Sequence, residues 1–141
     1  MAKLLLGKPV AEALCGRLSL RAEALRGRGI APKLAIIRCG ENPSDLSYER
    51  GALNRAAMVG VATQVVALPE DVTKDALLDA IAALNADETV HGVLLFRPLP
   101  KHLRPWDGEI RNALDPAKDV DGMTDLSCAG VFEGQRSDKR P

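Results

Sequence analysis

The side chains best suited to chemistry lie in three short segments of the 141-residue sequence, at 40–48, 96–100 and 115–121. The first segment ends in Tyr48, the only tyrosine of the sequence, and the third ends in Asp121. Tyrosine combines an apolar ring with a hydroxyl that forms hydrogen bonds, and an ionised carboxylate is a strong hydrogen-bond acceptor. Such groups can bind and orient a small polar molecule. The simpler alternatives are a tyrosine in the core and an aspartate that forms a turn before a glycine.

Alternating helical and strand patterns predict where these segments lie in the fold. In the helical patterns apolar residues recur every three or four positions, whereas the strand patterns are short apolar runs rich in β-branched residues. The predicted helices are 9–26, 42–59, 73–84 and a weaker one at 106–114. The predicted strands are 34–39, 61–68 and 90–96.

The second of these helices has a clear start and a clear end. Asn42 can accept a hydrogen bond from a free backbone amide of the first turn. Pro43 at the first helical position loses no hydrogen bond, because the amide there has no partner within the helix. Gly60 is expected to end the helix.

Strands that alternate with helices cannot pair as hairpins. They need crossover connections, which are almost always right-handed and which produce a parallel sheet. The sequence therefore predicts an α/β fold of three layers, with a mainly parallel sheet covered by helices on both faces. In such sheets ligands bind beyond the carboxyl ends of the strands, and the three segments are expected at that edge.

Composition limits the classes of function. The 19 Lys and Arg residues balance the 19 Asp and Glu residues, so no net field attracts nucleic acid or an anionic membrane. Hydrophobic residues make up 46% of the chain, enough for one domain around one core. Because no apolar run approaches a membrane span and no signal-peptide pattern opens the sequence, we expect a cytoplasmic protein that binds neither nucleic acid nor membranes.

The three cysteines, Cys15, Cys39 and Cys128, are an odd number at wide spacings. Zinc sites and disulfide frameworks use paired cysteines at short intervals. We therefore expect no metal site and three small buried hydrophobic residues. A reactive thiol is the alternative.

The three segments resemble, in order and spacing, motifs of the N-terminal folate-binding domain of the methylenetetrahydrofolate dehydrogenase/methenyltetrahydrofolate cyclohydrolase family. The matching runs are Gly40-Glu41-Asn42-Pro43 followed by Tyr48, then Pro98-Leu99-Pro100, then Lys118-Asp119-Val120-Asp121-Gly122. The resemblance covers 1–134, the catalytic domain. It implies that 135–141 is a tail or hinge toward a Rossmann-type nucleotide-binding domain, which is absent from this sequence.

The resemblance implies catalytic and substrate-binding roles for two residues. Tyr48 would lie along the pterin ring, with its hydroxyl near the reacting centre, and Asp121 would accept hydrogen bonds from the amino group and a ring nitrogen of the pterin. Pro98, Leu99 and Pro100 would shape the wall of the substrate pocket. One of the two prolines is expected to follow a cis peptide bond.

Two positions depart from the family. Ala52 replaces the lysine that acts as the acid/base group of the cyclohydrolase step, and Phe96 replaces the glutamine that holds this lysine. Arg97 is expected to point away from Phe96, because neighbouring side chains of a strand alternate between its faces. Arg55 lies on nearly the same helical stripe as Tyr48, but arginine is too basic to act as a general base. We expect residues 48, 52, 96 and 121 to converge around a single hollow.

The activity implied by the resemblance is oxidation of 5,10-methylenetetrahydrofolate with NAD(P), in one-carbon metabolism and purine biosynthesis. Hydrolysis of 5,10-methenyltetrahydrofolate is expected to be weak or absent. This chain would bind the reduced folate, whereas NAD(P) would be bound by the absent C-terminal domain, since no G-x-G-x-x-G run occurs here. The full-length protein is expected to be a homodimer.

Two other functional classes remain as alternatives. One is a non-catalytic module that binds a folate or another heterocycle, in which Phe96 provides a stacking surface. The other is a flavodoxin-like or receiver-like domain, although the sequence after the first strand lacks the acidic cluster of a receiver. A nucleic-acid role has least support, because there is no basic stripe or aromatic platform.

Overall fold

A computed structural model describes residues 6–132, in which three parallel strands form one sheet in the order β2-β1-β3. The central strand, β1 (Lys33–Cys39), pairs along its whole length with β2 (Ala62–Leu68). On its other side β1 pairs with β3 (Gly92–Leu95). The prediction of an α/β fold with a parallel sheet is confirmed.

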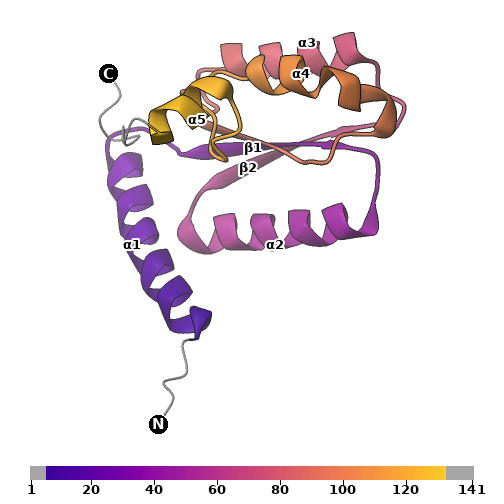
Figure 1. The fold of residues 1–141 in the computed structure, drawn as a ribbon. Coiled ribbons are helices and arrows are strands. Elements are labelled where there is room, and N and C mark those ends of the chain that lie inside the picture. Colours follow the sequence, from indigo (N-terminus) through magenta and orange to yellow (C-terminus); the bar gives the residue numbers. More distant parts are fainter. Residues whose placement is uncertain (1–5, 133–141) are drawn as a thin grey trace.

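Helices cover both faces of the sheet (Figure 1). On one face lies α2 (Pro43–Val59), which connects β1 to β2. On the other lie α3 (Lys74–Ala86), which connects β2 to β3, and α4 (Asp107–Asn112). The remaining helices are α1 (Gly7–Gly27), the 3-10 helix η1 (Lys101–Trp106) and α5 (Asp125–Phe132).

The main core lies between the sheet and the α3–α4 layer. Ala35 and Ile37 of β1 are fully buried in it, whereas Ile36 between them is buried toward α2, because side chains alternate along a strand. Of the apolar residues of α3, Leu77, Ile81 and Leu84 are buried in this core, and Leu78 is partly buried against it. Burial of such side chains on both faces explains why β1 is an almost uninterrupted apolar run.

The predicted start and end of α2 are confirmed, and α3 has a similar cap. The side chain of Asn42 accepts a hydrogen bond from the Ser44 amide at 3.0 Å, and Thr73 accepts one from the Ala76 amide at 3.2 Å. Gly60 ends α2 in the left-handed conformation, with φ +75°. A Cβ at this glycine would also collide with the guanidinium of Arg26, which donates a hydrogen bond to the Gly60 carbonyl.

Several elements differ from the sequence prediction. β3 is shorter than the predicted strand 90–96, and the weak helix predicted at 106–114 is a 3-10 helix followed by the short α4. α5 was not predicted, because its residues have no amphipathic pattern and its start depends on distant contacts. Asn112 of α4 accepts a hydrogen bond from the Asp125 amide at 2.8 Å, which fixes where α5 begins.

The predicted burial of the cysteines is wrong for one residue and incomplete for the others. Cys128 is exposed, and its thiol lies 3.3 Å from the Gly122 carbonyl. Cys15 and Cys39 are half-buried. Burial raises the pKa of the Cys39 thiol, so this group is protonated at neutral pH and is a poor nucleophile.

The boundary predicted at residue 134 and the tail at 135–141 lie outside the described residues. Within residues 6–132, no helix combines the length and the apolar character needed to cross a membrane.

The loop after α4 is built around two charged side chains. The ammonium of Lys118 donates hydrogen bonds to the carbonyls of Leu84, Asn85 and Asp87, at 2.7–2.8 Å, and so satisfies the carboxyl end of α3. Val93 of β3 forms a parallel bridge with Asp119, and its amide donates to the Lys118 carbonyl. The loop therefore continues the sheet beyond β3.

The carboxylate of Asp119 organises the turn that follows. It accepts hydrogen bonds from the amides of Gly122, Met123 and Thr124, at 2.8, 3.1 and 2.9 Å. Burial alone would raise the pKa of Asp119, but hydrogen bonds from Thr124, Ser127 and Met123 outweigh that effect and hold the pKa below 3.8. The folded chain therefore favours the ionised carboxylate.

We predict that Asp119→Asn destabilises the fold by about 1 kcal/mol at neutral pH, because an amide nitrogen cannot accept the Thr124 hydrogen bond. A lowered pKa stabilises the fold above the unfolded-state pKa, and this contribution disappears as the pH falls through the folded-state pKa. Urea unfolding from neutral pH down to about pH 2 should show the two free energies of unfolding converging. Asp79→Asn, at an exposed position on α3, is the control. A difference that is constant across the acid range would contradict the prediction.

Candidate functional site

Three of the predicted site residues meet in one hollow at the carboxyl edge of the sheet. This space, the Tyr48 hollow, has a volume of about 270 Å³. It is lined by Tyr48 from α2, Phe96 after β3 and Asp121 from the loop. The rings of Tyr48 and Phe96 are in edge-to-face contact, with centroids 5.3 Å apart and an interplanar angle of 64°. Phe96 is only 8% exposed, whereas Tyr48 is 63% exposed. The tyrosine is therefore a surface ring supported by a buried one, and not a core residue.

Asp121 is placed to accept hydrogen bonds from a ligand. It is exposed, and among the described residues it has no hydrogen-bond partner on the protein. The turn before Gly122 depends on the carboxylate of Asp119 instead. Asp119 therefore fixes the backbone, and Asp121 remains available at the hollow.

Ala52 does not line this hollow. It borders an adjoining space of about 710 Å³ that shares only Tyr48 with the first. The prediction that residues 48, 52, 96 and 121 surround a single hollow is thus wrong for Ala52, which lies one helical turn beyond the tyrosine. Arg55 also borders the second space, but its guanidinium donates to the Cys15 sulfur at 3.2 Å and so is directed toward α1.

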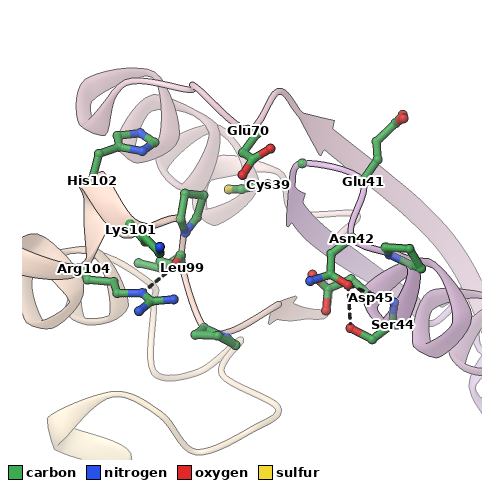
Figure 2. Close-up of a pocket in the computed structure, with 14 residues that line it drawn as sticks. Cys39, Glu41, Asn42, Ser44, Asp45, Glu70, Leu99, Lys101, His102 and Arg104 are labelled. Atoms are coloured by element: carbon green, nitrogen blue, oxygen red, sulfur yellow. Dashed lines mark hydrogen bonds between the residues drawn. The ribbon is translucent and has the colours of Figure 1, made fainter.

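Pro98, Leu99 and Pro100 line a third and larger hollow, of about 780 Å³ (Figure 2). Asn42 and Asp45 lie on the opposite wall, and Asp45 borders the Tyr48 hollow as well. The predicted cis peptide bond is confirmed at Arg97–Pro98. The Pro-Leu-Pro segment therefore forms a wall of this neighbouring space and not of the Tyr48 hollow.

A buried ion pair that was not predicted joins β1 to α2 at the residue after Tyr48. Arg38, the second-to-last residue of β1, donates to the carboxylate of Glu49 at 2.8 Å. The two side chains are only 8% and 12% exposed. Arg38 also donates to the Gly40 carbonyl. Because Glu49 follows Tyr48 in α2, the pair fixes the N-terminal half of this helix against the sheet. The signal in the sequence was an arginine inside an apolar strand, since a buried charge needs a partner.

The prediction that Arg97 points away from Phe96 is confirmed for its guanidinium, although Arg97 still contributes to the lining of the Tyr48 hollow. The guanidinium is directed toward α4, where Nε and Nη2 donate to the Asp107 carboxylate at 3.1 and 2.6 Å.

In the part of the chain that the structure describes, no group of three or more His, Cys, Asp or Glu side chains could hold a metal ion. The Tyr48 hollow instead offers the aromatic pair of Tyr48 and Phe96 and the free carboxylate of Asp121. Arg97, which also lines it, is paired with Asp107. Such an arrangement can stack against a flat ring and accept hydrogen bonds from its edge.

Comparison with known proteins assigns this arrangement to a family. The sequence model described as "Tetrahydrofolate dehydrogenase/cyclohydrolase, catalytic domain" matches residues 5–121. The bifunctional protein FolD of Alkaliphilus metalliredigens is 43% identical over 137 residues, which are 97% of this chain and 48% of that protein. The chain thus spans about half the length of the curated relatives it matches.

Solved structures give the same result. The bifunctional enzyme FolD, methylenetetrahydrofolate dehydrogenase/cyclohydrolase, from Campylobacter jejuni superposes with a TM-score of 0.88 at 30% identity, over 93% of this chain and 46% of that one. The methylenetetrahydrofolate dehydrogenase-cyclohydrolase of Trypanosoma brucei, solved with NADP cofactor and inhibitor, gives 0.85 at 29% identity, over 92% and 44%. The chain described here belongs to the tetrahydrofolate dehydrogenase/cyclohydrolase family and matches its catalytic domain.

Proposed function

We propose that this chain provides the folate site of an enzyme that oxidises 5,10-methylenetetrahydrofolate with NAD(P). The observation that carries the proposal is the convergence of Tyr48, Phe96 and Asp121 on one hollow at the carboxyl edge of a parallel sheet. Family membership makes a reduced folate the natural ligand for this hollow.

The proposed role of each residue follows from its chemistry. The exposed ring of Tyr48 would lie along the pterin, held in orientation by the edge-to-face contact with Phe96. The carboxylate of Asp121 would accept hydrogen bonds from the pterin amino group and a ring nitrogen, because an ionised carboxylate accepts two parallel donors well. The site would then fix both the plane and the rotation of the ring.

Hydride transfer from the methylene carbon requires mainly that two rings be held in the correct orientation. The hydride acceptor would be a nicotinamide dinucleotide, as the NADP in the trypanosomal relative suggests. The residues of this chain do not fit that cofactor, because the sequence has no G-x-G-x-x-G between a strand and a helix. We therefore assign NAD(P) binding to a region outside this chain, and to this chain only the orientation of the folate.

Hydrolysis of the methenyl product makes different demands. Water must attack and protons must move, and a positioned acid/base group accelerates such steps about a hundredfold to ten-thousandfold. Ala52 cannot provide one, and Phe96 cannot hold one by a hydrogen bond. Arg55 is directed toward Cys15 and is too basic to accept a proton. We propose that cyclohydrolase activity is weak or absent.

The first test is a calorimetric titration of the chain with tetrahydrofolate. We expect binding that weakens about tenfold or more in Asp121→Asn, because a hydrogen-bonded charge is lost. Tyr48→Leu should weaken binding severalfold, since the stacking surface is removed. Asp71→Asn, at an exposed position away from the hollow, is the matched control. Equal affinity in all four proteins would place the ligand elsewhere.

The second test restores the missing groups. We expect the double variant Ala52→Lys, Phe96→Gln to accelerate hydrolysis of 5,10-methenyltetrahydrofolate on the order of a hundredfold over the unmodified chain. This half-reaction needs no nicotinamide, so loss of the methenyl absorbance measures it directly. Ala57→Lys with Phe96→Gln is the control, because residue 57 is exposed on the same helix but does not border either space beside Tyr48. Rapid hydrolysis by the unmodified chain would refute the proposal.

A second candidate function is a non-catalytic module that binds a folate or another heterocycle. The specific observation in its favour is that both departures from the family make the surroundings of Tyr48 more apolar, which favours stacking over proton transfer. Tetrahydrofolate binding, together with no turnover in either half-reaction by a full-length protein, would favour this candidate over the dehydrogenase.

A further inference from the structure

Two walls of the Tyr48 hollow are joined through a chain of charged side chains on α4. One wall is the segment after β3, where Phe96 and Arg97 line the hollow. Arg97 donates to both oxygens of the Asp107 carboxylate, at 3.1 and 2.6 Å. A bidentate pair of this kind fixes direction as well as distance, so the position of Arg97 depends on Asp107.

The other wall is the loop that carries Asp121. Arg111 lies one helical turn beyond Asp107 in α4, with Nε 3.9 Å from the same carboxylate. Its Nη1 donates to the carbonyl of Met123 at 2.8 Å, two residues after Asp121. Nη2 of Arg111 also pairs with Asp125 at 2.5 Å. The position of the loop therefore depends on Arg111.

Asp107 is the group that both arginines share. Its carboxylate is 29% exposed, so solvent only partly screens the two pairs. α4 itself is held in the core by the fully buried Ile110. Asp107 does not line the hollow, and so it has no direct contact with a ligand there. Any influence it has on binding must act through Arg97 and Arg111.

We propose that Asp107 is a positioning residue that sets the separation between the Phe96 wall and the Asp121 loop. Without its charge, the two guanidiniums lose their common partner and repel each other. The loop that carries Asp121 can then move relative to the aromatic pair. A ring stacked on Tyr48 would no longer lie where the Asp121 carboxylate can accept its hydrogen bonds. For the ligand, this inference rests on the proposed folate site. The movement of the loop can be measured without a ligand.

The test compares Asp107→Asn with Glu109→Gln. Both changes remove one negative charge from α4, but Glu109 pairs with Lys74 of α3, away from the hollow. Hydrogen exchange without ligand should be faster at the amides of Met123 and Thr124 in Asp107→Asn, and unchanged there in Glu109→Gln. Tetrahydrofolate affinity should fall about threefold to tenfold in the first variant only.

A double-mutant cycle separates positioning from general destabilisation. Asp121→Asn should weaken tetrahydrofolate binding less in the Asp107→Asn background than in the unmodified chain, because the carboxylate is already displaced. Faster loop exchange in a chain that binds no tetrahydrofolate would leave the loop role intact and refute the proposed function. Unchanged exchange in Asp107→Asn, or additive losses of affinity in the cycle, would overturn the inference.

Discussion

The backbone pairing of β1 with a parallel strand on each side is the constraint from which the rest of the site follows. Its residues Ala35, Ile36 and Ile37 are fully buried, which is tolerable because their amides and carbonyls are satisfied by β2 and β3. Since all three strands run the same way, their carboxyl ends reach one edge. The chain segments that follow β1 and β3 are therefore brought together although they are distant in sequence.

Charged side chains that have partners on the protein fix the segments that carry the free groups at this edge. Arg38 and Glu49 pair with each other and hold the N-terminal half of α2, whereas Lys118 bonds to carbonyls at the end of α3 and Asp119 bonds to amides of the turn that follows it. In both places the bonded groups lie close in sequence to a group without such a partner, Tyr48 or Asp121. The fold thus satisfies one set of polar groups itself and presents a second set to solvent. A preorganised site requires this division, because a group that already has a partner on the protein is less available to a ligand.

The elements with local signals could be predicted from the sequence, and those that depend on tertiary contacts could not. The start of α2 follows from Asn42 and Pro43, whose chemistry acts within one turn. α5 begins where Asn112 holds Asp125, a contact between two helices that no periodic pattern encodes. Likewise, motif spacing brought Tyr48, Phe96 and Asp121 to one edge, but it could not show that Ala52 borders a separate space. The spacing of residues along a helix predicts on which face of the helix each side chain lies. The boundary of a cavity depends on every neighbouring side chain.

The apolar character of residue 96 is consistent with its surroundings in a way that a polar side chain would not be. Phe96 is nearly buried and is in edge-to-face contact with the Tyr48 ring, and Leu94 and Leu95 line the same hollow. An amide in this position would need partners for its oxygen and its nitrogen, and with alanine at position 52 no lysine could supply one. Alanine at position 52 and phenylalanine at position 96 are therefore physically compatible. Beside an alanine, an aromatic ring suits position 96 better than an amide would, because it needs no hydrogen-bond partner and packs against Tyr48.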